Sequence, residues 1–513
     1  MSGDITLTNA TIKTVPNENG DIAALIYAQS SNIILENTTV VANDYIEMSA
    51  IYTMLGSITI NNSSVTTSSI GNVAISAGSM EQGAPNQVVT ITNSELNIAS
   101  DMMGIVCGGS LFKMENVKGH FQLTKDMAYA IVAVTRLEIS NCELDIYATP
   151  IEDGSLGLGG KIVKIDDSNI DITIGGTEGN FGIAADGEVT ITESEVQIKG
   201  TSTAISGIYN ANGNVNITDS NVGISVLGTE KEGLTAGIFT QNGYLTVNGG
   251  NLKIMATAPM DNELTACIYT MTMLPCKFIN ADVLLQGNKV CILAPNLTEF
   301  GGEYELVASK SIDGSEKEEY SEDNITTYQY FNIHPFYEVT FDANGLEGTM
   351  EAIENIYGSF QLPECTFTVP ENAFFKGWAL SKDGEIIEDP EITVSSNITL
   401  YAIWKEFTPS DTPNDTPSDT PNDIPQDHTH DFGTEYKSDA ENHWKECACG
   451  EKIMLSSHVD NNENGGCDVC GSTLSKKGLG AGAIVAIVIA SVLVVGGGGF
   501  SLYWFVLKKK VVK

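Results

Sequence analysis

The chain has 513 residues, with 26 Lys and Arg against 66 Asp and Glu, and a formal net charge of −40 at pH 7. This length exceeds what one hydrophobic core fills, so we expect several units along the chain. So acidic a surface repels phosphate backbones, which argues against nucleic acid and favours divalent cations or neutral glycans, unless the charge serves solubility alone. With 50 glycines and only 7% aromatic residues, turn-rich β-structure is favoured over a helical bundle.

An apolar motif repeats eleven times between Ile5 and Leu293, as in ITLTNATIKT, VTITNSELNI and VNITDSNVGI. The first residue of each copy, which we call its start, is apolar. A second apolar residue follows two positions later, which is the alternation of a half-buried strand. The starts lie 23 to 31 residues apart, at Ile5, Ile33, Ile58, Val89, Phe112, Leu137, Val163, Val189, Val215, Leu245 and Cys276.

A corner residue, polar in every copy except the one with Gly249, stands four positions after each start. It is usually Asn, which tolerates left-handed backbone geometry, so we expect a tight corner there and an internal ladder of stacked copies. A small residue such as Ser94, Ser168, Ser194 or Ser220 often follows. The corner positions are Asn9, Asn37, Asn62, Asn93, Asn116, Asn141, Asp167, Glu193, Asp219, Gly249 and Asn280.

A third apolar segment, such as GIVCGG or SGIYNA, precedes most starts. Three short strands per repeat resemble the right-handed parallel β-helix, which implies an all-β stack of about eleven turns over residues 1–295. The late copies also resemble a family of bacterial secreted carbohydrate-binding β-helices. That resemblance implies binding of acidic or neutral polysaccharide, with calcium as an accompanying ion.

Enzymes of the β-helix class need clustered acids or an arginine base at a local departure from the repeat. The densest acidic corners are Asp166–Asp167 and Glu193–Glu195, and Arg136 is the chain's only arginine. Because the corner acids recur at one repeat position, a structural ladder explains them. We therefore predict no catalytic residues and no enzyme.

We expect residues 296–336 to form a connecting segment and residues 337–405 a separate module. The module contains VTFDANG from Val339, Gly377-Trp378 and LYAIW from Leu400. These marks resemble the internalin B-repeat, also called the Listeria-Bacteroides repeat. The resemblance implies a small β-grasp-like spacer of bacterial surface proteins, without catalysis of its own. Trp378 and Trp404 are expected in its core rather than in a sugar-stacking platform.

A Pro/Asp-rich linker, residues 406–427, is expected to be extended. It precedes a Cys/His-rich module, residues 428–472, which resembles a small His/Trp/Cys module of surface proteins in gut-type Gram-positive bacteria. Its close cysteine pairs suit a tetrahedral Zn²⁺ site or, outside the cell, two disulfides. The candidate metal ligands are Cys447, Cys449, Cys467, Cys470, His443 and His458.

A weaker metal signal overlaps this module. Asp460, Asn462, Asn464 and Gly465 follow the order of a calcium loop, but Gly471 replaces the glutamate that such a loop needs at its twelfth position. The two hypotheses, Ca²⁺ or a simple Asn-Gly turn, stay open.

Residues 478–507 contain no charge and exceed the ~20 residues needed to cross a bilayer as a helix. Lys508, Lys509 and Lys510 follow directly, so the positive-inside rule predicts a cytoplasmic tail of residues 508–513 and an extracellular bulk. This topology normally requires a signal peptide. Met1–Asp4 leads directly into a strand-like segment and does not begin a basic and apolar leader of that kind. Either translation begins further upstream or the protein is tail-anchored in the cytosol; we favour the first.

Together these features predict a single-pass, membrane-anchored bacterial surface protein. We expect it to bind polysaccharide or the surface of a host or neighbouring cell. The alternatives are a polysaccharide lyase or glycoside hydrolase of the β-helix type and a structural stalk that binds nothing.

Overall fold

The structure is a computed structural model that describes residues 3–14, 22–42, 46–78, 86–125, 127–151, 154–177, 179–259, 262–272, 274–294, 298–369, 373–406, 436–438, 442–446, 452–457, 467, 470 and 472. These residues are almost entirely β-structure, with one short 3₁₀-helix, η1 (Glu322–Thr327). The described residues up to Lys405 belong to one compact unit, and those from Glu406 onward belong to a second.

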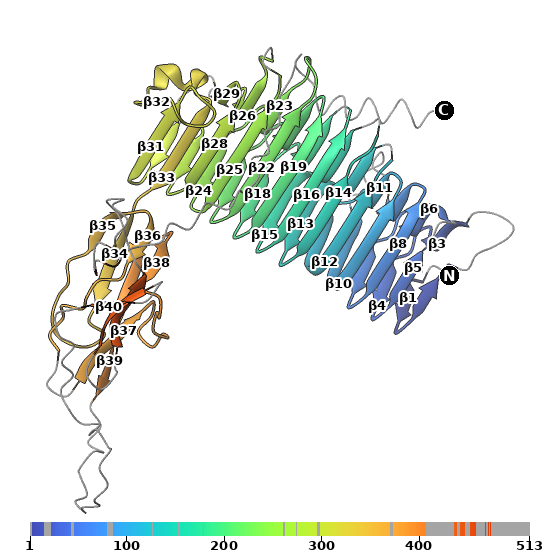
Figure 1. The fold of residues 1–513 in the computed structure, drawn as a ribbon. Coiled ribbons are helices and arrows are strands. Elements are labelled where there is room, and N and C mark those ends of the chain that lie inside the picture. The colour runs from blue at the N-terminus through green and yellow to red at the C-terminus, as the bar shows by residue number, and fades with distance from the viewer. Residues whose placement is uncertain are drawn as a thin grey trace, which may run out of the picture. The chain divides into compact units, whose positions relative to one another are not determined.

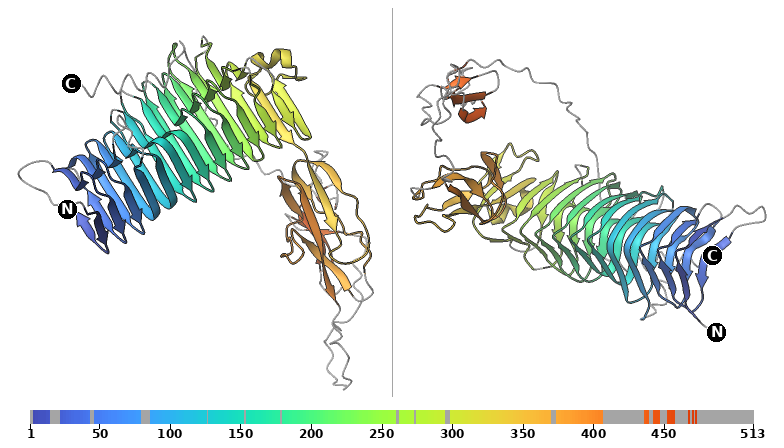
Figure 2. Two further views of the ribbon diagram at one scale, coloured as in Figure 1. Left: turned by 180° about the vertical axis from the view of Figure 1, so that it is seen from behind. Right: turned by 90° about the horizontal axis from the view of Figure 1, so that it is seen from below.

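A parallel β-solenoid of about ten turns forms most of the first unit (Figures 1 and 2). Its strands stack in three columns, and four long strands pass through a corner and so belong to two columns.

The first column contains β1 (Ile5–Thr8), β4 (Ile33–Glu36), β7 (Ile58–Asn61), β10 (Val88–Ser100), β12 (Leu111–Leu123), β13 (Ala128–Ser140), β15 (Ser155–Asp166), β18 (Val189–Thr192), β21 (Val215–Thr218), β24 (Leu245–Asn248), β27 (Lys277–Ile279) and β30 (Glu299–Gly301). The second contains β2 (Thr11–Lys13), β5 (Thr39–Ala42), β8 (Ser64–Ile70), the ends of β10 and β12, β14 (Glu143–Ala148), β16 (Asn169–Gly176), β19 (Glu195–Ser202), β22 (Asn221–Gly228), β25 (Asn251–Thr257) and β28 (Asp282–Gly287). The third contains β3 (Ile22–Ala28), β6 (Ile46–Thr53), β9 (Val73–Ala77), β11 (Met103–Cys107), the beginnings of β13 and β15, β17 (Asn180–Ala185), β20 (Ile205–Asn210), β23 (Thr235–Thr240), β26 (Thr265–Thr270) and β29 (Val290–Leu293).

The repeat predicted from the sequence is confirmed. Every predicted start lies in a first-column strand or, for Cys276, directly before one, and about ten turns form where eleven were expected. Corresponding residues of successive turns are paired, as Ile33 is with Ile58 and Ile58 with Val89. All three are fully buried, and burying such a side chain contributes about 1.5–3 kcal/mol. The core is thus a stack of aliphatic layers that no single turn could bury alone.

Residues predicted to be a connecting segment instead cap the solenoid. β31 (Tyr304–Ser309) pairs with β32 (Lys317–Glu318) and β33 (Tyr330–Pro335), and β33 runs antiparallel to β28 of the second column. Tyr328 and Phe331 of this cap are fully buried in the solenoid core. Reversing the strand direction covers the apolar end of the stack.

The module after the cap has its own core. A sheet in the order β35–β34–β39–β37 is formed by β34 (Tyr337–Asp342), β35 (Ile353–Ile356), β37 (Ala373–Ala379) and β39 (Ile398–Glu406). A second sheet pairs β36 (Gly358–Gln361) with β38 (Glu391–Val394). Trp378 is buried in the module core and donates Nε1–H to the Pro363 carbonyl at 2.8 Å. Trp404 donates likewise to Ala343 at 2.8 Å. Both indoles are structural, as predicted.

The second unit contains a small antiparallel sheet of β40 (Lys437–Ser438), β41 (Asn442–Glu446) and β42 (Lys452–Ser457). Its Trp444 is buried, and Lys445 lies over the Tyr436 ring at 5.2 Å. Among the described residues, no helix combines the length and the apolar character required to cross a bilayer. The predicted span, residues 478–507, lies outside the described part of the chain.

Candidate functional site

Each turn bends from its first to its second strand at a residue in the left-handed region. The backbone angle φ is 49° at Asn93, 56° at Asn116, 43° at Asp167 and 46° at Glu193. Asparagine favours this geometry, and the other corner residues are held in it by the pairing of their turns. The corners predicted from the sequence are therefore confirmed, and they align along the solenoid.

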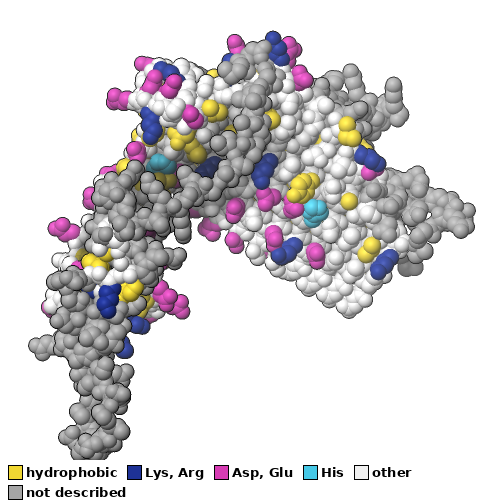
Figure 3. All heavy atoms as spheres, in the orientation of Figure 1, with side chains coloured by type: hydrophobic (Ala, Val, Ile, Leu, Met, Phe, Trp, Pro, Cys, Tyr) yellow, Lys and Arg dark blue, Asp and Glu magenta, His cyan; other side chains and the backbone are white. Residues whose placement is uncertain are grey.

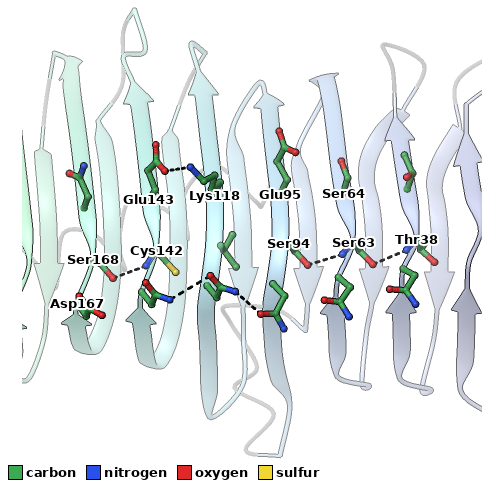
Figure 4. Close-up of a pocket in the computed structure, with 18 of the residues that line it drawn as sticks. Thr38, Ser63, Ser64, Ser94, Glu95, Lys118, Cys142, Glu143, Asp167 and Ser168 are labelled. Carbon is green, nitrogen blue, oxygen red and sulfur yellow. Dashed lines mark hydrogen bonds and ion pairs between the residues drawn. The ribbon is translucent and has the colours of Figure 1, made fainter.

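A buried hydroxyl ladder runs directly behind the corners (Figure 4). The Ser168 hydroxyl donates to the Asp166 carbonyl at 2.7 Å and accepts the backbone N–H of Cys142 at 3.1 Å. Ser194 repeats this arrangement with Thr192 and with the N–H of Ser168. Each hydroxyl thus satisfies a backbone donor of the neighbouring turn that would otherwise be buried without a partner.

The asparagine side chains form a second ladder on the solvent side. The amide of Asn116 donates to Asn93 Oδ1 at 2.7 Å, and the amide of Asn93 donates to Asn61 Oδ1 at 3.1 Å. The corner asparagines Asn93 and Asn116 are exposed at the surface, so the prediction of an internal asparagine ladder is wrong. The reason is that the left-handed corner points the side chain outward, and the buried position falls on the small residue that follows.

A shallow groove follows the corners across seven turns and encloses about 980 Å³. Asparagine amides and hydroxyls line most of it, and Asp167, Glu193 and Glu195 line its far end. Asp166 is not among the lining residues. The acids singled out from the sequence therefore occupy one end of an open groove in which polar, uncharged groups predominate.

A second hollow of about 350 Å³ adjoins this groove on the second column of strands, and the two share Glu95, Lys118, Glu143 and Asn169. Lys118 on β12 forms an ion pair with Glu143 on β14. Two residues further along the same strands, His120 Nδ1 lies 3.0 Å from Asp145 Oδ2. Asp171 of β16, the strand-pairing partner of Asp145, also lines the hollow.

An exposed aromatic ring lies next to His120. Tyr147 is 41% exposed, and its ring centroid lies 5.7 Å from that of His120 at an interplanar angle of 54°. Figure 3 shows acidic, basic, histidine and hydrophobic side chains gathered on this face of the solenoid. We call His120, Asp145, Tyr147 and Asp171, together with Lys118 and Glu143, the polar cluster. It combines an exposed aromatic ring with the hydrogen-bonding groups that line the hollow.

A glycine makes the position of His120 possible. Gly119 faces the core, where a Cβ atom would lie 2.8 Å from the Phe121 ring and 2.9 Å from Leu144 Cδ2. Without a side chain at Gly119, the large Phe121 ring fits inside the turn, and His120 stays on the outer surface. His120 and its neighbours were missed from the sequence, although a signal existed. His120, Asp145 and Asp171 each stand eight residues after their repeat starts.

The third column carries a different aromatic ladder. Phe181, Tyr209, Phe239 and Tyr269 lie in successive turns, with neighbouring ring centroids 5.1 to 5.5 Å apart. Tyr209 and Phe239 are buried in a second apolar cluster. Their ring faces are covered, unlike that of Tyr147. Arg136 lies on the first column and pairs with Glu138 at 2.6 Å, so it belongs to neither groove nor polar cluster.

The predicted metal ligands are only partly placed. Cys467 is buried and Cys470 half-buried; the Cys467 N–H donates to the Ser472 carbonyl at 2.8 Å, and the Cys470 thiol donates to the Ser472 hydroxyl at 3.3 Å. His443 lies on β41 without a described side chain, and Cys447, Cys449 and His458 lie outside the described residues. Among the described side chains, no group of three or more His, Cys, Asp or Glu is placed to hold a metal.

Comparison with known proteins identifies one part of the chain. Residues 337–403 match the family model of the Listeria-Bacteroides repeat domain, as the VTFDANG and LYAIW motifs indicated. No curated protein matches the chain, and no solved structure matches it. The repeat and the β-solenoid fit a surface or adhesion-type protein.

Proposed function

We propose that the chain is a bacterial surface protein whose solenoid binds polysaccharide along its corner groove without cleaving it. The observation that carries this proposal is the continuity of the groove with the polar cluster. An extended chain of sugars matches a groove of this kind, since exposed corner amides recur from turn to turn and can bind successive sugar hydroxyl groups. The Tyr147 ring offers a sugar an apolar face to lie on.

The charge of the groove selects among polysaccharides. Glu95, Glu143, Asp145 and Asp171 line the hollow together with one lysine and one histidine, and three further acids line the end of the groove. The excess of carboxylates repels uronic acids and accepts hydroxyl or ammonium donors. The preferred ligands are therefore neutral sugars or sugars with free amino groups.

The apolar segment of residues 478–507 and the lysines after it support anchoring in the cytoplasmic membrane, with the solenoid outside. In this arrangement the Listeria-Bacteroides repeat and the Pro/Asp-rich linker carry the solenoid away from the lipid. Protease added to intact cells tests the topology: removal of the solenoid supports the anchor, and complete protection overturns it.

The Cys/His module is proposed to hold Zn²⁺ through its two cysteine pairs, with His443 and His458 as further candidates. Its thiolates and imidazoles are the ligands that Zn²⁺ prefers, and the C-x-x-C spacing of Cys467 and Cys470 suits binding of one ion by both thiolates. Mass spectrometry of the native full chain distinguishes a zinc adduct from the alternative of two disulfides.

One experiment distinguishes binding from cleavage. The full chain is incubated with insoluble neutral polysaccharides, amino polysaccharides and polyuronates. The proposal predicts co-sedimentation with a neutral or amino polymer and no release of reducing ends. Release of reducing or unsaturated ends would establish the enzyme instead. A chain that sediments with no polymer would support the structural stalk.

A further inference from the structure

From the second turn onward, one column of the solenoid interior holds only small side chains. It lies in the third strand of the turn, directly before a buried isoleucine or leucine, and holds Gly207 and Gly237 in two late turns. A Cβ atom at these glycines would lie 2.4 Å from Ile224 Cγ2 and 2.2 Å from Ile254 Cγ2. The earlier turns place Ala50, Ala74, Gly104, Ala130, Gly157 and Gly182 in this column.

The last two turns place cysteines in the same column. Ala266 pairs with Val290 and Ile268 with Ile292, so Cys267 and Cys291 stand opposite each other on the parallel strands β26 and β29. Neighbouring strands lie ~4.8 Å apart, within the ~4.4–6.8 Å that a disulfide spans between Cα atoms. Both side chains are fully buried.

Both thiols converge on the turn at Gly287. A Cβ atom built on Gly287 would lie 3.3 Å from Cys267 Sγ, and the Cys291 thiol donates to the carbonyl of Leu285, two residues before Gly287, at 3.3 Å. Burial and the neighbouring Cys267 thiol hold the pKa of Cys291 well above its usual value. Two buried thiols on neighbouring strands are therefore inert once the last turns have closed.

We infer that Cys267 and Cys291 become joined by a disulfide when the chain folds in an oxidising compartment. The oxidant is a disulfide, of a small molecule or of a protein, that undergoes thiol–disulfide exchange. One cysteine thiolate attacks it to form a mixed disulfide, and the second thiolate then displaces the partner's remaining sulfur. The two cysteines lose two electrons and two protons, and the partner leaves as two thiols.

The exchange must precede closure of the last turns, because the folded core excludes the oxidant. The bond would tie β26 to β29 beside the antiparallel cap and close a loop that contains β27 and β28. It would thus restrain the last turns of the stack.

The test refolds the reduced full chain with oxidised glutathione and maps disulfides by peptide mass spectrometry. Cys267 and Cys276 share one tryptic peptide, between Lys253 and Lys277, so the mapping is done in a Cys276→Ser variant as well. The inference predicts a cross-linked Cys267–Cys291 peptide in both chains, and a thermal midpoint that falls on reduction.

Two variants serve as controls. Cys291→Ala puts into the column a residue that an earlier turn already accepts there, and it should abolish both the cross-link and the effect of reductant. Cys142→Ser supplies the hydroxyl present at that repeat position in Ser94 and Ser168, and it should leave both unchanged. Recovery of Cys267 and Cys291 as alkylated thiols after oxidative refolding to the native state would overturn the inference, as would a Cys276–Cys291 link.

Discussion

His120 and Asp145 lie side by side on adjacent turns of the solenoid, with His120 Nδ1 3.0 Å from Asp145 Oδ2. Each occupies the same repeat position on β12 and β14, and the pairing of these strands sets their contact. The outer face of a solenoid thus brings together residues 25 positions apart in the chain, and this is how a repetitive scaffold acquires a local site.

The hydroxyl ladder should contribute measurably to stability. Ser168→Ala removes the acceptor of the buried Cys142 N–H, and leaving such a group without a partner costs about 1–3 kcal/mol. Urea denaturation of the full chain should show this decrease in the free energy of unfolding of the solenoid transition. The exposed Ser225 on β22 provides the control, since Ser225→Ala should change it by less than about 0.5 kcal/mol. Equal effects at both positions would contradict a structural role for the ladder.

The column of small residues predicts a strong position dependence for Gly→Ala. Gly207→Ala places a methyl group 2.4 Å from Ile224 Cγ2 and should destabilise the solenoid by about 1–3 kcal/mol. Gly175→Ala meets nothing closer than 3.6 Å, so its thermal midpoint should stay at or above that of the parent chain. Equal thermal midpoints for the two variants would contradict the proposed role of the column.

Stability should fall at high pH because of a buried thiol. Burial raises the pKa of Cys276 to about 12 from the usual 9.0, so the unfolded chain releases this proton at lower pH than the folded chain. The contribution of the Cys276 thiol to the free energy of unfolding is fully present below pH ~9 and is lost progressively as pH rises from ~9 to ~12. A Cys276→Ala variant should show a shallower decline of unfolding free energy over this range, measured by urea titrations at several pH values. An unchanged slope would refute the assignment.

The repeat module should depend on its buried indole. Trp378→Ala removes a side chain that is 2% exposed and should destabilise the module by about 3–5 kcal/mol. Limited proteolysis should then cleave between residues 337 and 405 while the solenoid stays intact. Leu380→Ala is the control, because Leu380 is 61% exposed, and it should leave the cleavage pattern unchanged.

Sequence reasoning recovered the strands and corners because both signals are local. Alternation at Val189 and Ile191 marks a strand, and asparagine at Asn93 marks a left-handed corner. The cap escaped prediction because β33 pairs antiparallel with β28, a long-range choice that no local pattern encodes. The polar cluster was missed for another reason. Its members differ in residue type from turn to turn, and alternation marks them only as outward-facing.

The groove and its polar cluster are tested most directly by titrating the full chain with the neutral or amino oligosaccharide that it retains. Tyr147→Ala should weaken binding about tenfold, because the stacking face is lost. Tyr27→Ala is the matched control. Tyr27 is 49% exposed and its ring also lies 5.7 Å from a neighbouring ring, that of Tyr52, but on the third column. Unchanged affinity on Tyr147→Ala, or an equal loss with Tyr27→Ala, would contradict the proposed binding site.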